Sequence, residues 1–162
     1  MIRIQDIWST ITELLPPALQ ESYDNCGLQV GDPSLPATGV LCCVDITEQV
    51  LQEALQKKCN VIIAHHPLLF KGLKRIGTES YIERCVRFAI RHDLAIYAAH
   101  TNADNADGGL NYLLAEDLGL SQVTSLEPQR GTLMELVTFV PTQYVSRVSE
   151  ALWSAGAGKI GA

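Results

Sequence analysis

No segment of this sequence is apolar enough to cross a membrane as a helix. Glycine, aspartate or histidine interrupts every apolar run before it reaches the roughly 20 residues that a spanning helix needs. A secretory signal is missing as well, because the stretch MIRIQDIWST has an early acid and no small-residue cleavage site behind an apolar core. We therefore expect a cytoplasmic protein that has no membrane partner.

Basic residues are also scarce. The chain carries 12 Lys and Arg against 18 Asp and Glu, which gives a formal net charge of −6 and a pI near 5.1. Proteins that bind nucleic acids generally show a basic surplus, so this balance argues against nucleic acid as a partner. With 47% hydrophobic and 19% charged residues, the composition is that of a globular protein and not of a disordered one.

The five cysteines do not form a pattern typical of disulfides or of zinc ligands. Their number is odd, and no two of them are spaced as C-x-x-C. Several lie inside apolar segments. We therefore interpret them as free, buried thiols of a reducing compartment.

Apolar periodicity predicts a layered α/β domain. Continuous apolar segments, typical of buried strands, occupy residues 40–44, 61–64 and 94–99. Segments with helical spacing lie at residues 3–15, 47–58, 79–91 and 110–117. This alternation indicates a mostly parallel sheet with flanking helices, and residues 21–39 read as a long polar loop.

The character of the sequence changes near Pro128. Residues 132–140 alternate like a strand, and residues 142–155 have the spacing of an amphipathic helix. We therefore divide the chain into an α/β core over residues 1–127 and the beginning of a second, incomplete unit over residues 128–162.

Polar side chains follow each of the three predicted core strands. The carboxyl ends of parallel strands meet at one edge of the sheet, where ligands of open α/β sheets bind. Three of the four histidines of the chain fall at two of these ends. The residues expected at this edge are Asp45, Thr47, His65, His66, His100, Thr101, Asn102 and Asp104.

The pair His65-His66 is the first candidate for a metal site. Neighbouring residues of a strand point to opposite faces, so both rings serve one site only if the strand ends there, and Pro67 favours that end. A solvated histidine pair is the alternative. Asp104, on the polar loop after the third strand, adds a carboxylate, and we predict His65, His66 and Asp104 as ligands of two divalent ions per subunit. Imidazole and carboxylate without cysteine suit Zn, Mn, Fe or Ni.

His100 and Asp45 are the candidate catalytic residues. His100 is open as a fourth ligand, as a residue behind the ligands, or as an acid or base. Asp45 either orients a histidine N–H or caps the helix that follows it. The loop of Lys71, Lys74 and Arg75 follows the histidine pair and is placed to attract an anionic substrate, with a merely solvated surface as the alternative.

Four segments together resemble the NIF3-like (Nif-three-like) proteins, a family also named GTP cyclohydrolase I type 2. The segments are YDNCGLQVGD, VDIT, IIAHHPLLF and AAHTNADNADGGLNYLLAEDLGL, in the order of the family within residues 1–125. The resemblance implies a layered α/β core with a dinuclear metal site, in which His65, His66 and Asp104 are ligands. It also implies ring-like homohexamers whose sites face an internal cavity.

The end of the chain departs from the pattern of this family. The family completes its metal site with an H-x-x-x-E motif near the C-terminus, and this chain has no histidine after His100. Longer members insert a PII-like, ferredoxin-like module, and residues 133–162 are similar to its first strand and helix. We therefore expect a C-terminally truncated member that ends inside this insert.

These expectations lead to two functional hypotheses. The first is a metal-dependent hydrolase that acts on a nucleotide or a similar anionic small molecule, with GTP ring opening as the reaction that the family name suggests. The second is a non-catalytic metal-binding protein with a regulatory or interaction role. Turnover of substrate separates the two, because the second predicts metal binding without it.

Overall fold

The computed structural model describes residues 1–126 and 135–158, and the chain forms two compact units. The first unit comprises residues 1–121 and the second residues 122–162. Within the described residues, no helix combines the length and the apolar character that crossing a membrane requires.

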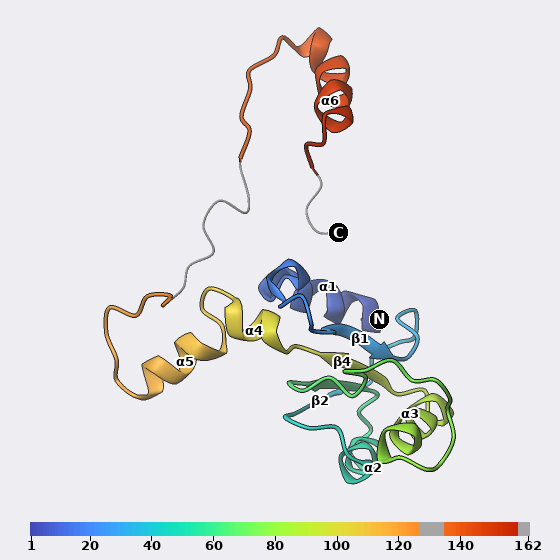
Figure 1. Cartoon of the computed structure of the whole chain (residues 1–162). Coiled ribbons are helices and arrows are strands. Elements are labelled where there is room, and N and C mark those ends of the chain that lie inside the picture. The colour runs from blue at the N-terminus through green and yellow to red at the C-terminus, as the bar shows by residue number, and fades with distance from the viewer. Residues whose placement is uncertain (127–134, 159–162) are drawn as a thin grey trace. The chain divides into compact units, whose positions relative to one another are not determined.

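A four-stranded mixed sheet forms the centre of the first unit (Figure 1). Its strands are β1 (Gly27–Val30), β2 (Val40–Cys43), β3 (Val61–Ala64) and β4 (Ala95–Ala98), in the spatial order β1-β4-β3-β2. β2, β3 and β4 run parallel to one another, and β1 pairs with β4 in the antiparallel direction. The predicted α/β fold with a mostly parallel sheet is therefore confirmed.

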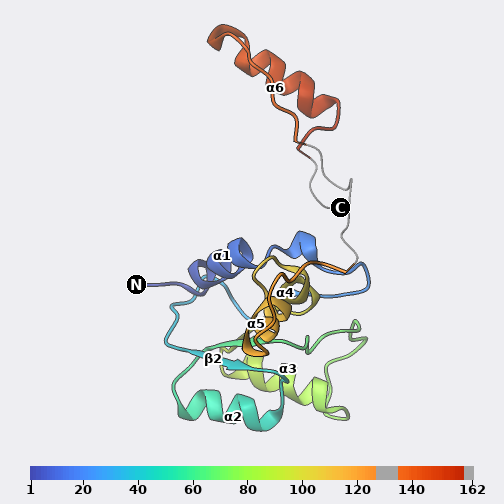
Figure 2. The same ribbon diagram turned by 90° about the vertical axis from the view of Figure 1, so that its left-hand side faces the viewer.

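Helices cover both faces of this sheet, as Figure 2 shows. α1 (Ile4–Leu14) packs on one face, while α2 (Glu48–Gln56) and α3 (Tyr81–Arg91) pack on the other. Two further helices, α4 (Thr101–Asn105) and α5 (Leu110–Asp117), follow β4. All except α4 were expected from the apolar spacing, whereas α4 replaces the predicted polar loop.

Two apolar clusters hold the layers together. On the face of α1, the buried side chains of Ile4 and Trp8 pack in one cluster with Tyr97. On the opposite face, Leu51 of α2 belongs to a second cluster that includes Ile62 of β3. The central strands β3 and β4 thus have apolar layers on both sides, which is why they read as continuous apolar segments.

The edges of the sheet differ from the prediction. The segment 21–39, predicted as a loop, contains β1. This strand was missed because four residues with only two apolar side chains show too little periodicity to recognise. The segment 40–44 was expected to be buried, but β2 lies at the edge of the sheet, and Val40 and Cys42 are exposed.

The five cysteines are free, as predicted, but only Cys85 is fully buried. Cys42 is exposed because it lies on the edge strand, so the prediction of uniformly buried thiols is wrong. Burial raises the pKa of Cys43 and of Cys85 to about 11. Both thiols therefore stay protonated and weakly reactive at neutral pH.

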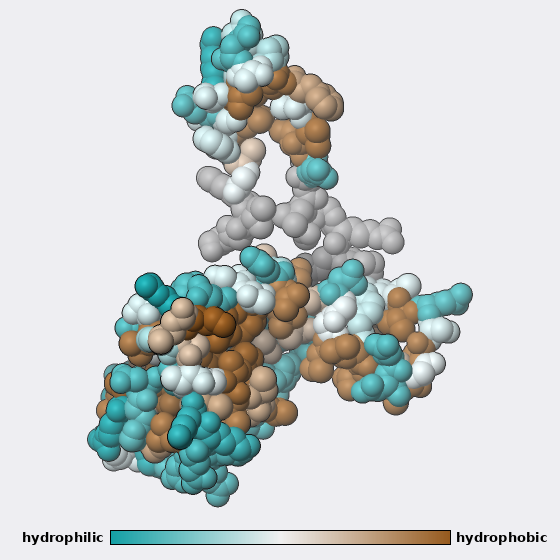
Figure 3. All heavy atoms as spheres, turned by 180° about the vertical axis from the view of Figure 1, so that it is seen from behind, coloured by the Kyte–Doolittle hydropathy of each residue, from teal (hydrophilic) through white to brown (hydrophobic). Residues whose placement is uncertain are grey.

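Several apolar side chains remain at the surface of the first unit. Along and just after α5, Leu113, Leu114 and Leu118 are half exposed or more. Figure 3 shows apolar side chains, in brown, at the surface of this unit. Exposed apolar surface often marks an interaction site.

The second unit contains one α-helix within its described residues, α6 (Val145–Ser154), which follows a 3-10 turn (Thr142–Tyr144). This agrees with the helix predicted over residues 142–155. The strand predicted over residues 132–140 lies partly outside the described residues, and residues 135–140 do not form a strand. A strand needs a partner for its backbone hydrogen bonds, and the described part of the chain pairs none with this segment. The assignment of residues 128–162 to a PII-like insert stays a prediction.

Candidate metal centre

The carboxyl ends of β2, β3 and β4 lie in register at one edge of the sheet. Cys43 pairs with Ala64, and Ala64 pairs with Ala98. The pairing continues beyond the strands, since Ala99 N donates to Ala64 O at 2.8 Å. The polar residues that leave the sheet here are therefore close in space: Asp45, His65, His66 and His100.

Three imidazole rings converge at this edge. One ring nitrogen from each of His65, His66 and His100 lies within 4.8 Å of the other two. The centroid of the His65 ring is 4.9 Å from that of His66 and 5.2 Å from that of His100. Because β3 ends at Ala64, two successive side chains reach the same place, as expected from Pro67. We call these three rings the histidine cluster.

Each ring of the histidine cluster is held through its Nδ1 atom. The contacts are His65 Nδ1 to Ala99 O at 3.0 Å, His66 Nδ1 to Asp45 Oδ1 at 2.8 Å, and His100 Nδ1 to Asp24 Oδ1 at 2.8 Å. Carbonyl and carboxylate oxygens only accept hydrogen bonds, so Nδ1 carries the proton in each neutral ring. The lone pair then lies on Nε2, which is the usual arrangement of histidines that bind a metal.

Asp45 orients a histidine and does not cap the next helix. Its carboxylate accepts from His66 Nδ1, whereas the cap of α2 is Thr47, whose Oγ1 accepts from Val50 N at 3.2 Å. The side chain of Asp45 is 67% exposed and that of His66 is 50% exposed, so water competes for this bond. A catalytic role for Asp45 stays a prediction.

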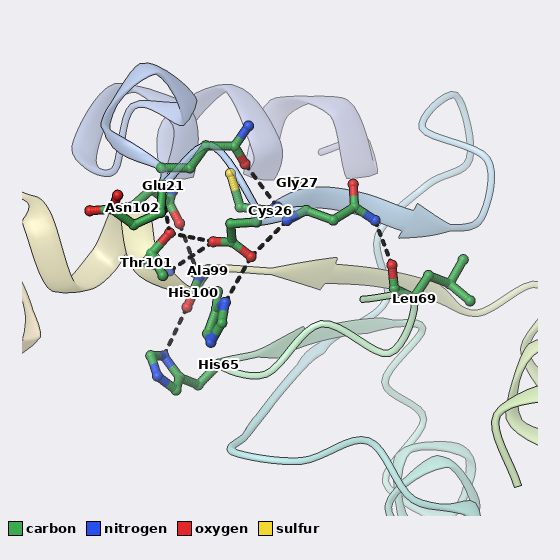
Figure 4. A network of polar contacts seen from close by, with 12 residues as sticks. Glu21, Cys26, Gly27, His65, Leu69, Ala99, His100, Thr101 and Asn102 are labelled. Atoms are coloured by element: carbon green, nitrogen blue, oxygen red, sulfur yellow. Dashed lines mark hydrogen bonds and ion pairs between the residues drawn. The ribbon is translucent and has the colours of Figure 1, made fainter. Parts of the chain in front are cut away.

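Asp24 is a site residue that the sequence reasoning missed. Its side chain is fully buried and accepts hydrogen bonds from His100 Nδ1, from Thr101 N and Oγ1, and from Asn25 N. Burial acts to raise the pKa of Asp24, but these hydrogen bonds outweigh it and hold the pKa below its ordinary value. Figure 4 shows His100 and Thr101 within this network. Asp24 lies in the segment YDNCGLQVGD, which contributed to the family resemblance. The sequence analysis assigned no role to this aspartate.

The structure does not bring Asp104 into the histidine cluster. Among the described residues, the only set of three or more potential ligand atoms within 4.8 Å of one another is that of the three rings. Asp104 lies in α4, half-buried, and its backbone N donates to His100 O at 3.2 Å. Its predicted role as a ligand stays a prediction.

The basic loop after the histidine pair borders a separate hollow. Lys74 and Arg75 line a surface hollow of about 660 Å³ together with Leu73, Ile76 and side chains from β1 and α3. No residue of the histidine cluster lines this hollow. Attraction of an anionic substrate by the loop stays a prediction.

The three anchored Nδ1 atoms make a direct prediction for the metal-free protein. In a chain labelled with ¹⁵N-histidine, at a pH where the rings are neutral, we expect three of the four histidines to carry their proton on Nδ1. A long-range ¹H–¹⁵N correlation spectrum measures this. His92, whose ring lies tilted against that of Phe88 at the end of α3, serves as the internal comparison. Protons on Nε2 in the other three rings would contradict the geometry described.

Comparisons with known proteins agree with this architecture. Residues 2–162 match the Duf34/NIF3 (NGG1p interacting factor 3) family. The chain belongs to this family. It is 42% identical over 158 residues to a GTP cyclohydrolase 1 type 2 homolog of Bacillus subtilis, an alignment that covers 97% of this chain and 42% of the relative. A homolog of the same name from Halalkalibacterium halodurans is 41% identical over 162 residues, and this alignment covers 99% of this chain and 42% of the relative.

Solved structures of this family have the same fold. A Bacillus cereus protein related to NIF3 matches with a TM-score of 0.75 and 40% identity, over 99% of this chain and 44% of that chain. Reduced HcgD from Methanocaldococcus jannaschii matches with a TM-score of 0.69 and 29% identity, over 75% of this chain and 48% of that chain. The resemblance to NIF3-like proteins is therefore confirmed. The chain spans about 42% of the length of the two curated relatives.

Proposed function

We propose that this NIF3 family chain provides ligands for two divalent metal ions in a hydrolase that acts on a nucleotide or a similar anionic small molecule. The observation that carries the proposal is the convergence of three imidazoles, each with Nδ1 bonded to an acceptor, at the carboxyl edge of the sheet. Rings held in this way keep their Nε2 lone pairs free, and one nitrogen of each ring lies within 4.8 Å of the other two, an arrangement that a solvated histidine pair would not give.

The donor set suits a catalytic metal. The histidine cluster contains no thiolate, which fits Zn, Mn, Fe or Ni better than a structural zinc site. His65, His66 and Asp104 would hold the ions, and His100 would serve as a further ligand or as an acid or base. When bound, two such ions supply Lewis acidity and lower the pKa of water.

The residues around the cluster prepare it for this chemistry. The Ala99 carbonyl and the Asp45 carboxylate fix the orientation of the His65 and His66 rings. The exposed cations Lys74 and Arg75 border a hollow separate from the cluster, and from there they would attract an anionic substrate toward an otherwise acidic protein.

We also propose that the protein works in the cytoplasm as a homo-oligomer, a hexamer in the full-length form. The five free cysteines support a reducing compartment, and the leucines exposed along α5 offer apolar surface for assembly. The family resemblance supports the ring. The acidic pI of about 5.1 argues against nucleic acid as a partner, whereas the local positive charge of the basic loop would attract a small anionic molecule.

Turnover assays on the full-length protein test the proposal. The protein is stripped of metal, reloaded with Zn²⁺ or Mn²⁺, and assayed with GTP and with a model phosphodiester. We expect turnover that chelation removes and that added metal restores. Tight metal binding without turnover of either substrate would favour the alternative, a non-catalytic metal-binding protein with a regulatory role. Failure to bind metal would contradict both.

A further inference from the structure

Asp24 joins the histidine cluster to a distant part of the chain. It lies in the loop before β1 and is 76 residues away from His100 in sequence. Its carboxylate is completely shielded from solvent, although the side chain of His100 remains 19% exposed. A buried carboxylate is costly unless its hydrogen-bonding capacity is satisfied. The contacts of Asp24 therefore indicate what the surrounding structure is built to hold.

The carboxylate of Asp24 accepts four hydrogen bonds. Oδ1 accepts from His100 Nδ1 at 2.8 Å and from Asn25 N at 2.6 Å, and Oδ2 accepts from Thr101 N at 3.0 Å and from Thr101 Oγ1. The Thr101 hydroxyl also accepts from Glu21 N at 2.9 Å, which directs its own proton to Asp24. Backbone N–H groups cannot become acceptors. Of these groups, the imidazole is the one that would change its role by changing tautomer.

The backbone of His100 is held separately from its ring. Its φ of −108° and ψ of −116° belong neither to a helix nor to a strand. Asn102, fully buried, accepts from His100 N at 2.9 Å through Oδ1 and donates to Leu15 O at 2.8 Å through Nδ2. Figure 4 shows His100, Thr101 and Asn102 together in this network. With the backbone fixed by Asn102, the orientation of the ring depends on Asp24.

We propose that Asp24 is a positioning residue that holds His100 in the Nδ1–H tautomer, with the Nε2 lone pair available to the histidine cluster. The consequence for metal binding rests on the proposed function, whereas the effect on the tautomer does not. Asp45 makes the same 2.8 Å contact with His66, but it is exposed and its described hydrogen bonds involve no other donor. The two aspartates therefore differ: four donors fix the carboxylate of Asp24, whereas one donor contacts that of Asp45 and water competes for the bond.

Asp24→Asn tests the proposal by exchanging one acceptor oxygen for a donor NH₂ group. Each oxygen of Asp24 accepts two hydrogen bonds, but His100 is the one donor that can become an acceptor by changing tautomer. We therefore expect the amide oxygen to stay with Thr101 and the NH₂ group to face His100, with loss of the bond from Asn25 N. The ring then accepts at Nδ1 and carries its proton on Nε2, which removes the lone pair from the cluster. We expect ¹⁵N-histidine spectra of the metal-free chain to show this switch. We also expect the Zn²⁺ affinity to fall about 10–100-fold, which is typical when a metal ligand loses the residue that hydrogen-bonds to it.

Asp32→Asn is the control, since it removes one carboxylate charge at a residue whose described side-chain hydrogen bonds include no ring of the histidine cluster. Asp32 Oδ1 accepts from Ser34 N at 2.8 Å, and an asparagine oxygen can keep this bond. We therefore expect the ring tautomers and the Zn²⁺ affinity of this variant to stay as in the wild type. Melting temperatures of the metal-free variants, measured by circular dichroism, report any general damage to the fold.

Three results would overturn the inference. They are an unchanged His100 tautomer in Asp24→Asn, an equal loss of Zn²⁺ affinity in both variants, and a lower melting temperature with an unchanged affinity. If Asp24→Asn does not fold, the wild-type spectrum decides, because a proton on Nε2 of His100 in the native chain would also exclude the proposed role. A wild-type chain that binds no metal would contradict the proposed function, while the tautomers would still decide the role of Asp24.

Discussion

Replacement of His65 by alanine is expected to lower the affinity for Zn²⁺ or Mn²⁺ by more than about 100-fold. This exceeds the loss that is typical when a residue hydrogen-bonded to a metal ligand is removed, because His65 is expected to be a ligand itself. His65 is half-buried, and its Nδ1 atom is bonded to the backbone carbonyl of Ala99 next to the neighbouring strand. The position of its Nε2 atom is thus set by the sheet itself and not by a mobile side chain. Calorimetric titration of the metal-stripped chain measures the affinity, and circular dichroism confirms that the variant is folded.

His92→Ala is the matched control, because it removes an imidazole outside the histidine cluster. His92 is the C-terminal cap residue of α3, where its ring lies tilted against that of Phe88 with a centroid distance of 4.5 Å. We expect this variant to bind metal like the wild type. Equal losses in both variants would indicate non-specific binding to surface imidazoles, and would remove the main support for the proposed function.

Much of the fold was predictable because its signals are local. α1, α2 and α3 each have an apolar face of helical spacing, and their ends lie within a few residues of the predicted ones. β1 and α4 were not predictable in this way. β1 is four residues long and depends on pairing with β4, and α4 is five residues long and contributes Asn102 to a bond with Leu15. Their stability comes from tertiary contacts, which leave little periodicity in the sequence.

The same distinction applies to the candidate site. His65, His66 and His100 were expected together because parallel strands bring their carboxyl ends to one edge, a rule that needs no knowledge of side-chain contacts. Asp24 was not expected there, since its contact with His100 depends on the path of an irregular loop. The loop path is set by pairwise bonds such as Asn25 Nδ2 to Leu69 O at 2.7 Å, which no spacing rule reveals.

The second large effect concerns the stability of the sheet. Gly31, directly after β1, has a φ of +117°, and a Cβ atom there would lie 2.6 Å from Ala95 Cα and 2.8 Å from Ala95 Cβ. The obstacle is the backbone of β4, which cannot move without disturbing the pairing on its other side. We expect Gly31→Ala to lower the free energy of unfolding by roughly 2–5 kcal/mol, from the unfavourable φ and the overpacking together. Urea denaturation of the metal-free chain measures this loss.

Gly27→Ala separates the two causes, because Gly27 has a similar φ of +98° with open space around its missing Cβ. Its expected cost is only the backbone part, roughly 1–2 kcal/mol. The two positions also differ in their distance from the metal edge, since Gly27 pairs with Ala98 near His100, whereas Gly31 contacts Ala95 at the opposite end of β4. Gly31→Ala should therefore lower stability strongly and leave the metal affinity of the folded fraction unchanged. An equal loss of stability in both variants would show that close packing against β4 contributes nothing, and that the backbone conformation alone requires glycine.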